Sequence, residues 1–339
     1  MNILKYICLP GLLVSGDIQT VSAVESKTDK NPNILVILID DAGYNDFGFM
    51  GSKEMQTPNI DALTSEGVVF TDAHVAATVS SPSRACLITG RYGHRFGYEC
   101  NLSDRTNGLP LEEETIAEVF KTNGYRTAAI GKWHLGSRDE QHPNNRGFDL
   151  FYGMKAGGRD YFYNEKKSDR PGDERNLLLN DRQVKFEKYL TDAFSEKAVE
   201  FINESSQPFM MYLAYNAVHT PMQATDEDMA KFEGHPRQKL AAMTYALDRG
   251  VGTVIRGLKD SGKFDNTLIF FLSDNGGATT NQSSNYPLKG FKGNKFEGGH
   301  RVPYFVVWKN GIPAGKPYDG LVSSLDIFAT AIDAASISK

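Results

Sequence analysis

Two pairs of carboxylate and amide side chains follow apolar runs of the chain, where strands of a sheet would end. Asp40 and Asp41 come directly after one aliphatic run, and Asp274 and Asn275 come after another. Adjacent carboxylates repel each other unless a cation lies between them. Oxygen ligands of this kind suit Ca²⁺ or Mg²⁺ better than zinc. Either pair alone would be typical of a turn or a helix cap, but two pairs after similar runs favour a metal site.

A different chemistry is indicated by the segment Ser80-x-Pro82-x-Arg84. Small hydroxyl residues and a proline precede an apolar stretch here, a pattern typical of a helix N-terminus. Backbone amides and the helix dipole favour a bound anion at such an end, and Arg84 lies one turn further on. Taken alone, the same pattern is that of an ordinary helix cap.

The elements that would position these residues alternate between strands and helices. The predicted strands are apolar runs, typical of parallel strands that are covered on both faces, at residues 34–39, 126–130, 209–215 and 267–272. The predicted helices start near residue 57 or cover residues 115–121, 192–202, 240–258 and 326–330. This alternation predicts an α/β fold with a large, mostly parallel sheet flanked by helices. Residues 153–180 are polar and rich in glycine and tyrosine, and we expect a long surface loop that helps to bind a ligand.

The amino-acid composition argues against several classes of protein and of binding site. The chain has 339 residues, of which 40% are hydrophobic and 23% charged, so it is expected to fold into a globular structure rather than remain disordered. The formal net charge is −5 with no long basic block, so we expect no nucleic-acid partner. The three cysteines have no CxxC spacing, which argues against a thiolate zinc site. We expect Cys86 and Cys100 to be free or to form the one disulfide.

The N-terminus has the features of an export signal. Lys5 is followed by a short apolar run, and a small-residue pattern ends near residue 23. We expect a signal peptide at residues 1–23, a polar spacer at 24–32 and a catalytic domain at 33–339, with the protein periplasmic or secreted. The alternative is a disordered N-terminal tail. No later run is long enough to suggest a stable membrane span.

The serine segment resembles a known family signature. Ser80-x-Pro82-x-Arg84, followed by the sequence LITGR, is similar to the signature of the formylglycine-dependent sulfatases (type I, serine type). This family belongs to the alkaline-phosphatase-like superfamily. Further segments resemble its motifs in the expected order, at residues 33–48, 131–136, 208–221, 273–276 and 288–303. The resemblance covers residues 32 to 335 and implies an alkaline-phosphatase-like α/β sandwich.

The resemblance also implies roles for individual residues. Ser80 would be oxidised to formylglycine (3-oxoalanine), and one Ca²⁺ would be held by that residue together with Asp40, Asp41, Asp274 and Asn275. The positive side chains that would bind and neutralise sulfate are Arg84, Lys132 and Lys292. His219 would protonate the leaving group and His134 would remove a proton to release sulfate. The residues alone leave open whether His134, His219 or Lys292 is the leaving-group acid.

The implied activity is that of an arylsulfatase-like sulfuric ester hydrolase. A sulfated carbohydrate is the expected substrate, with another sulfate ester as the alternative, and Arg159, Tyr161 and Tyr163 are candidates to contact a sugar. A serine-type signature implies maturation by a radical formylglycine-generating enzyme and a bacterial source. Family members continue into a smaller C-terminal domain, which we expect to be truncated or absent here. The open alternatives are a phosphate or phosphonate monoester hydrolase and a non-catalytic protein that binds sulfated glycans.

Overall fold

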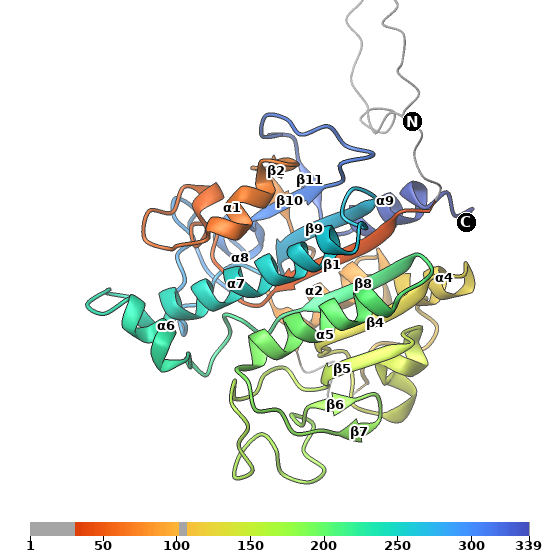
Figure 1. The fold of residues 1–339 in the computed structure, drawn as a ribbon, viewed down its shortest axis with the longest axis horizontal. Coiled ribbons are helices and arrows are strands. Elements are labelled where there is room, and N and C mark those ends of the chain that lie inside the picture. Colours follow the sequence, from red (N-terminus) through yellow and green to blue (C-terminus); the bar gives the residue numbers. More distant parts are fainter. Residues whose placement is uncertain (1–30, 102–106, 339) are drawn as a thin grey trace, which may run out of the picture.

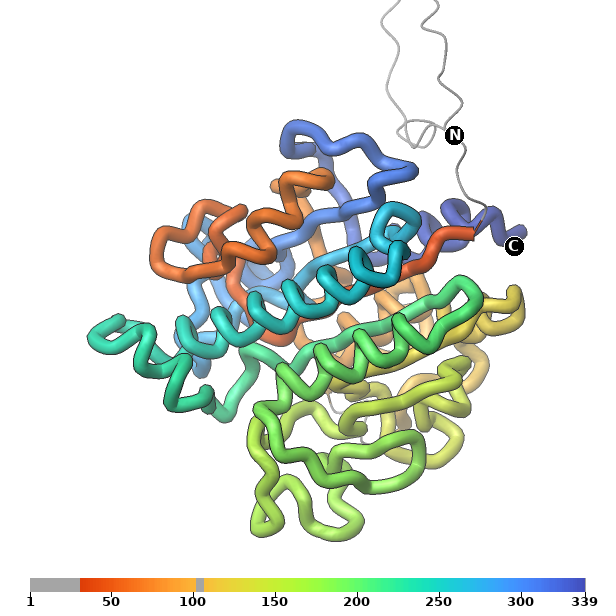
Figure 2. The backbone as a smooth tube through the Cα atoms, in the orientation of Figure 1, coloured from red at the N-terminus to blue at the C-terminus, as the bar shows by residue number. Residues whose placement is uncertain are grey.

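A mixed sheet with a parallel centre organises the chain. In the computed structural model, which describes residues 31–101 and 107–338, nine strands pair in the order β2-β10-β9-β1-β8-β4-β5-β6-β7. Strands β9, β1, β8, β4 and β5 are parallel, whereas β2, β10, β6 and β7 pair antiparallel with their neighbours. A second, two-stranded sheet pairs β3 with β11. Strands that are far apart in the sequence therefore lie side by side (Figure 2).

The strands of both sheets are short to medium in length. Their bounds are β1 Asn33–Ile39, β2 Val68–Phe70, β3 Ala73–His74, β4 Arg126–Lys132, β5 Leu150–Met154, β6 Leu178–Leu179, β7 Arg182–Gln183, β8 Phe209–Ala214, β9 Thr267–Ser273, β10 Tyr304–Val307 and β11 Val322–Ser323. The α-helices are α1 Pro58–Thr64, α2 Ser80–Thr89, α4 Ile116–Thr122, α5 Leu190–Glu204, α6 Asp226–Lys231, α7 Gln238–Asp260, α8 Glu297–His300 and α9 Asp326–Ala334.

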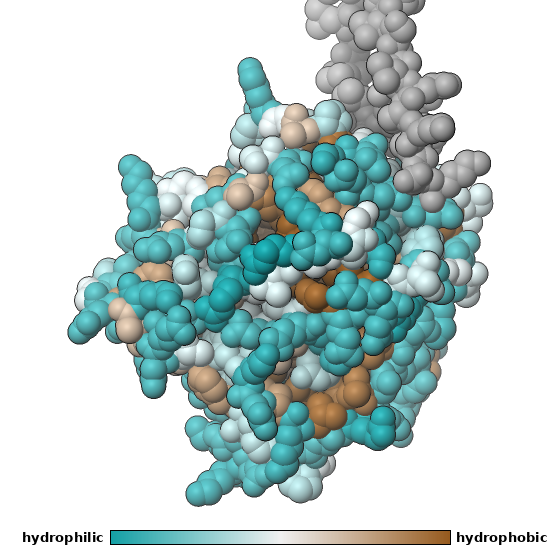
Figure 3. All heavy atoms as spheres, viewed as in Figure 1, coloured by the Kyte–Doolittle hydropathy of each residue, from teal (hydrophilic) through white to brown (hydrophobic). Residues whose placement is uncertain are grey.

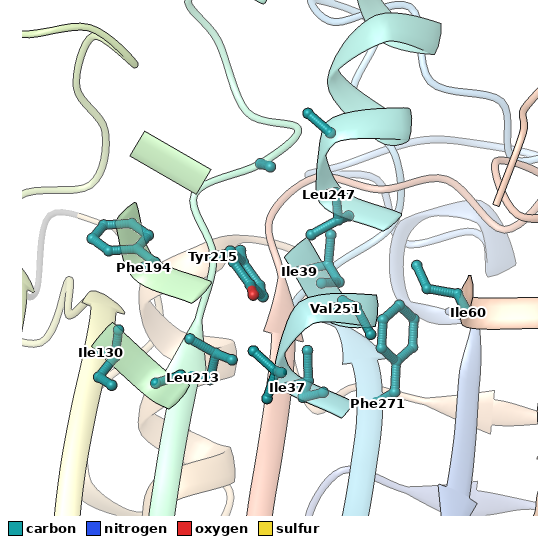
Figure 4. Packing of buried hydrophobic residues seen from close by; sticks show 14 of the residues in the cluster. Ile37, Ile39, Ile60, Ile130, Phe194, Leu213, Tyr215, Leu247, Val251 and Phe271 are labelled. Atoms are coloured by element: carbon teal, nitrogen blue, oxygen red, sulfur yellow. The ribbon is translucent and has the colours of Figure 1, made fainter. Parts of the chain in front are cut away.

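Helices cover both faces of the sheet and create two apolar cores (Figure 1). Alternate residues of β1 point to opposite faces, so Ile37 belongs to one core and Val36 to the other. The first core lies under α1, α5 and α7, where Leu247 and Val251 of α7 pack toward the strands (Figure 4). The second core lies under α2, α4 and α9. Burial on both faces explains why the central strands are continuous apolar runs.

The predicted α/β architecture is confirmed, and the element bounds differ from the predictions by only a few residues. Helix α4 begins after Thr115, whose side chain accepts a hydrogen bond from the amide of Glu118 while Glu118 caps the Thr115 amide in return. Helix α1 begins at Pro58, as its fixed φ favours. The predicted signal peptide at residues 1–23 lies outside the described residues.

The expectation for residues 153–180 is only partly correct. This segment begins within β5 and ends beyond β6, and the chain between these strands contains buried polar residues as well as exposed ones. Arg159 and Tyr161 are 2% and 0% exposed. The segment therefore packs partly into the body of the protein, which its polar composition did not indicate.

The face that carries α5 and α7 is covered mostly by hydrophilic residues, with scattered hydrophobic ones (Figure 3). Among the helices of the described residues, none combines the length and the apolar character that crossing a membrane requires. Within the same residues Cys86 is buried and forms no disulfide, so the alternative of a disulfide between Cys86 and Cys100 is wrong, and Cys100 is exposed.

Candidate active site

The Asp40-Asp41 pair and the Asp274-Asn275 pair lie close together because β1 and β9 are adjacent and parallel. Ile39 pairs with Ser273 at the carboxyl ends of these strands, so Asp40 and Asp274 leave the sheet side by side. The Asp274 amide donates a 2.8 Å hydrogen bond to the Ile39 carbonyl, which continues the pairing. Asp41 has a φ of 61°, a left-handed conformation that turns the chain and that aspartate tolerates better than most residues. The carboxyl edge of the sheet therefore carries the cluster, as the sequence predicted.

Ser80 is the first residue of α2 and points into this cluster. Its hydroxyl oxygen lies 3.1 Å from Oδ1 of Asp40 and 3.2 Å from Oδ1 of Asn275. The Asn275 side chain in turn donates a 2.8 Å hydrogen bond to Asp41. All of these side chains are buried. The result is a compact set of oxygen atoms drawn from two strand ends and one helix N-terminus, the kind of donor set that Ca²⁺ prefers.

Two fully buried cations, Arg84 and Lys132, offset the negative charge of the carboxylates. Arg84 donates to Oδ2 of Asp274 through Nε at 3.0 Å and Nη2 at 2.8 Å, and its Nη1 reaches the Lys132 carbonyl. Lys132 Nζ lies 2.6 Å from Oδ2 of Asp40. Burial alone would raise the pKa of Asp40, but Lys132, His219 and Arg84 outweigh it and hold that pKa below the usual value. Burial lowers the pKa of Lys132 against the attraction of Asp40.

Lys292 and His219 lie on the more exposed side of the cluster. Lys292 Nζ is 2.6 Å from Oδ1 and 2.8 Å from Oδ2 of Asp41. His219 Nδ1 donates to the Thr220 carbonyl at 2.7 Å, because a carbonyl can only accept. Its Nε2 therefore faces the cluster, 3.7 Å from Asp41. The side chains of Lys292 and His219 are 18% and 22% exposed, so solvent and a substrate can reach them.

His134 lies at the end of β4, two residues after Lys132, and has a left-handed φ of 59°. It is 8% exposed. Burial is the main reason why its pKa is well below the usual value, and the charges of Lys132 and Arg84 add to the effect. The backbone at Gly157 passes so close that a Cβ there would lie 2.5 Å from His134 Nε2. A Cβ on Gly158 would lie 3.3 Å from the His219 ring.

The structure therefore brings the predicted site residues to one edge of the sheet, with His134 and His219 both under the Gly157-Gly158 segment. Sequence reasoning missed Asn281, whose Nδ2 donates to the carbonyls of Asp41 and Val218 at 3.1 and 2.9 Å. This amide therefore links the loop that follows β1 to the loop that carries His219. Its sequence neighbourhood has no feature that would have marked it.

Two of the predicted sugar contacts are wrong. Arg159 forms a buried bidentate ion pair with Asp169, at 2.7 and 2.8 Å. Tyr161 is also buried, and its hydroxyl lies 2.6 Å from the Asn216 carbonyl and 2.8 Å from that of His219. Both side chains hold the loops of the site in place instead of facing a ligand. They were misassigned because the polar composition of residues 153–180 suggested exposure.

Comparisons with known proteins agree with this geometry. The family model described as Sulfatase matches residues 32–337. "Uncharacterized sulfatase YdeN" of Escherichia coli (strain K12) is 34% identical over 93% of this chain and 64% of its own length. Arylsulfatase G of Mus musculus is 36% identical over 91% and 66%. The chain thus spans about two thirds of the length of these curated relatives.

Solved structures are similar as well. A crystal structure of Ps i-CgsB in complex with k-i-k-neocarrahexaose superposes with a TM-score of 0.86 and 44% identity, covering 91% of this chain and 73% of that one. PsFucS1 sulfatase from Pseudoalteromonas sp. gives a TM-score of 0.76 and 27% identity, covering 92% and 69%. The match of the family model over nearly the whole chain, together with the order of the motifs around Ser80, shows that this chain belongs to the sulfatase family.

Proposed function

We propose that the protein hydrolyses sulfate monoesters of carbohydrates at the cluster around Ser80. The observation that carries the proposal is the position of the Ser80 hydroxyl, within 3.2 Å of oxygens from both Asp40 and Asn275. Positive charges from Arg84 and Lys132 surround the same point. A nucleophile held among cations is suited to attack at the centre of an anionic ester.

One Ca²⁺ is the cofactor that this donor set fits. Asp40, Asp41, Asp274 and Asn275 can each supply an oxygen ligand. Asp40 and Asn275 contact the Ser80 hydroxyl, Asp41 accepts a hydrogen bond from Asn275, and Asp274 accepts one from the Asp41 amide. When bound, the ion would lower the pKa of the nucleophilic hydroxyl and offset the charge of the ester. The role of the chain is to hold four rigid ligands on two strand ends, so that little reorganisation accompanies binding.

Ser80 is proposed to act as formylglycine, which a radical maturase would form from the serine. An unmodified serine hydroxyl is a weak nucleophile unless a base activates it. Within the described residues the Ser80 hydroxyl hydrogen-bonds to oxygens of Asp40 and Asn275 and to no side-chain nitrogen. The arrangement therefore suits a modified residue better than a serine and histidine pair.

The three cations differ in exposure, and their proposed roles differ accordingly. Arg84 and Lys132 are fully buried and pair with Asp274 and Asp40, so they present positive charge to the buried side of the site. Lys292 is partly exposed, so it can exchange its contact with Asp41 for a contact with a sulfate oxygen. This mobile donor would stabilise the charge that develops on the sulfuryl oxygens.

The two histidines are suited to opposite proton transfers. The low pKa of buried His134 favours a neutral ring, which can accept a proton from the nucleophile's second hydroxyl when sulfate is released. His219 is fixed by its Nδ1 contact with the Thr220 carbonyl, so Nε2 is the atom that would deliver a proton to the leaving alkoxide. Lys292 remains the alternative acid.

The dependence of the hydrolysis rate on the leaving group distinguishes His219 from Lys292 as the acid. His219→Ala should slow hydrolysis of a sulfated sugar, whose alkoxide needs a proton, far more than hydrolysis of 4-nitrophenyl sulfate, whose phenolate does not. Lys292→Ala should slow both substrates by a similar factor, because it would remove a contact to sulfate. The reverse pattern would make Lys292 the acid.

A sulfated glycan is the proposed substrate class. Support comes from the 44% identity with Ps i-CgsB, which was crystallised with k-i-k-neocarrahexaose. Export to the periplasm or the medium, where such polymers are met, is proposed from the N-terminal sequence.

The test is release of inorganic sulfate from neocarra-oligosaccharides and other sulfated sugars, compared with phosphate release from matched esters. Sulfate release that disappears in Ser80→Ala is the expected result. A preference for 4-nitrophenyl phosphate over 4-nitrophenyl sulfate would indicate a phosphate or phosphonate monoester hydrolase. Binding of sulfated sugars without turnover would indicate a non-catalytic protein.

A further inference from the structure

A second group of metal-ligating side chains lies outside the Ser80 cluster. Nδ1 of His74 and Nδ1 of His300 face each other at 2.9 Å, and Oε2 of Glu297 lies 4.0 Å from Nε2 of His74. One potential ligand atom from each of these three residues lies within 4.8 Å of the other two. The side chains of His74 and Glu297 are 19% and 47% exposed, so an ion could enter from solvent. Neither His74 nor His300 is among the residues that the family resemblance assigns to the Ser80 cluster.

The tautomer of His74 is fixed in the form that a metal ligand needs. Its Nε2 lies 2.9 Å from Oδ1 of Asp72. An ionised carboxylate can only accept a hydrogen bond, so Nε2 carries the proton and the lone pair of the neutral ring is on Nδ1. A carboxylate behind a histidine is the arrangement that orients metal-bound imidazoles in proteins and raises their basicity.

The backbone holds the two histidines in register. His74 is in β3 and His300 ends α8, and the Val75 amide donates to the His300 carbonyl at 2.8 Å. The Ser324 amide donates to the His74 carbonyl at 2.9 Å. A site whose ligands are fixed on two paired segments loses little conformational freedom when an ion binds.

The local charge also suits a divalent cation. Asp72 and Glu297 contribute two negative charges, and Arg301 lies 3.4 Å from each of them and offsets one. With both imidazoles neutral, the group keeps one net negative charge. Arg301 is held by the Thr71 carbonyl, to which its Nε donates at 2.9 Å, so it is anchored beside the histidines rather than between them.

We propose that His74, Glu297 and His300 bind a divalent transition-metal ion of the zinc class, through Nδ1 of each histidine and the Glu297 carboxylate. Two imidazoles and one carboxylate are ligands that zinc accepts readily, and water would complete the shell. The all-oxygen cluster at Asp40 has a different preference, so the two sites should take different ions. The proposal does not depend on the proposed sulfatase activity.

Binding would move one proton within His300. Without metal and with both rings neutral, the 2.9 Å contact places a proton between the two Nδ1 atoms, and His300 donates it because His74 Nδ1 carries the lone pair. Zn²⁺ would bond to the Nδ1 lone pair of each neutral ring, so the proton of His300 Nδ1 would pass through solvent to Nε2 of the same ring, with no net release to the buffer. The ion would join the segment that leads to Ser80 with the segment that follows Lys292.

Titration of the metal-free full chain with Zn²⁺, in excess Ca²⁺ to occupy the oxygen cluster, tests this site. One equivalent should bind, as isothermal titration calorimetry would measure. His74→Gln and His300→Gln should lose this equivalent, whereas His94→Gln, an exposed histidine outside the group, should keep it. Asp72→Asn should weaken binding by about 10- to 100-fold. Circular dichroism without metal verifies that each variant is folded.

Histidine ¹⁵N spectra give an independent readout on the unaltered protein. Zn²⁺ should shift the Nδ1 resonances of His74 and His300, move the Nε2 resonance of His300 to the position of a protonated nitrogen, and leave the Nε2 resonance of His74 nearly in place. The proposal is overturned if no stoichiometric Zn²⁺ binds, if both glutamine variants retain it, or if the shifts fall on other histidines. Sulfatase activity is not part of either readout, so its absence would not affect the outcome.

Discussion

Lys132 Nζ and Asp40 Oδ2 form a 2.6 Å hydrogen bond, and both side chains are completely buried. An ion pair without water persists only when its geometry is good and neighbouring groups satisfy the remaining atoms. Here Asp40 also contacts the Ser80 hydroxyl, and Arg84 lies 3.8 Å from its other oxygen. The pair therefore keeps a carboxylate of the proposed calcium site charged at the point where Ser80 enters the cluster.

Removing this lysine should destabilise the metal-free protein. Lys132→Met leaves Asp40 as a buried charge that has lost its closest cation, at a cost of about 3–5 kcal/mol in the free energy of unfolding. Urea unfolding in EDTA measures the loss. Lys121→Met, which breaks the exposed pair with Asp149, is the control and should cost about 0–1 kcal/mol. Equal losses in the two variants would contradict the role given to Lys132.

Lys292 should affect turnover and not folding. Lys292→Ala removes a partly exposed cation that is proposed to contact sulfate. We expect kcat/KM to fall by about 10²–10³-fold, with little change in Tm. Steady-state kinetics with a sulfate ester check this. Lys295→Ala, which changes an exposed lysine of the same loop, should keep full activity. Near-normal turnover in Lys292→Ala would exclude it from the site.

Asp274 should control calcium affinity. Asp274→Ala removes a proposed ligand, so more Ca²⁺ should be needed to raise Tm, because an ion that binds only the folded state adds RT ln(1 + [Ca²⁺]/Kd) to the free energy of unfolding. A series of thermal unfolding curves at increasing Ca²⁺ measures the shift. Asp265→Ala, at a surface pair with Lys309, should leave the calcium dependence unchanged. An unaltered dependence in Asp274→Ala would remove that residue from the ligand set.

The Gly157-Gly158 segment should tolerate side chains unequally. A Cβ at Gly157 would meet His134 Nε2 at 2.5 Å, whereas one at Gly158 would lie 3.3 Å from His219. We expect Gly157→Ala to displace His134 and reduce kcat strongly, and Gly158→Ala to have a smaller effect. Gly315→Ala, where a Cβ would meet only the Pro313 carbonyl oxygen at 3.9 Å, is the control. If Gly157→Ala has normal kcat, the contact with His134 has no catalytic importance.

The sequence predicted those parts of the site that depend on local pattern. The apolar runs before Asp40 and Asp274 marked strand ends, and parallel strands place such ends at one edge. The serine-proline start of α2 likewise placed Ser80 at a helix N-terminus. Contacts made across long sequence separations were not accessible in this way. The Asn281 hydrogen bonds and the burial of Tyr161 arise from loop packing, for which a single sequence has no periodic signal.

The same limit applies to the histidines. A histidine in a short strand and another in a four-residue helix share no motif, and His74 meets His300 only because β3 and α8 are adjacent in the fold. His219, in contrast, was assigned to the site because residues 208–221 resemble a family motif, and in the structure it lies beyond the end of β8.

Peptide mass spectrometry across Ser80, on protein purified from its native host, tests the central claim most directly. The account predicts that the peptide is lighter by two hydrogen atoms than the unmodified serine peptide and that it reacts with an aldehyde probe. Serine of unaltered mass in protein that releases sulfate would contradict the proposed nucleophile. Unaltered serine in inactive protein, even after coexpression with a radical maturase, would contradict the proposed sulfatase activity itself.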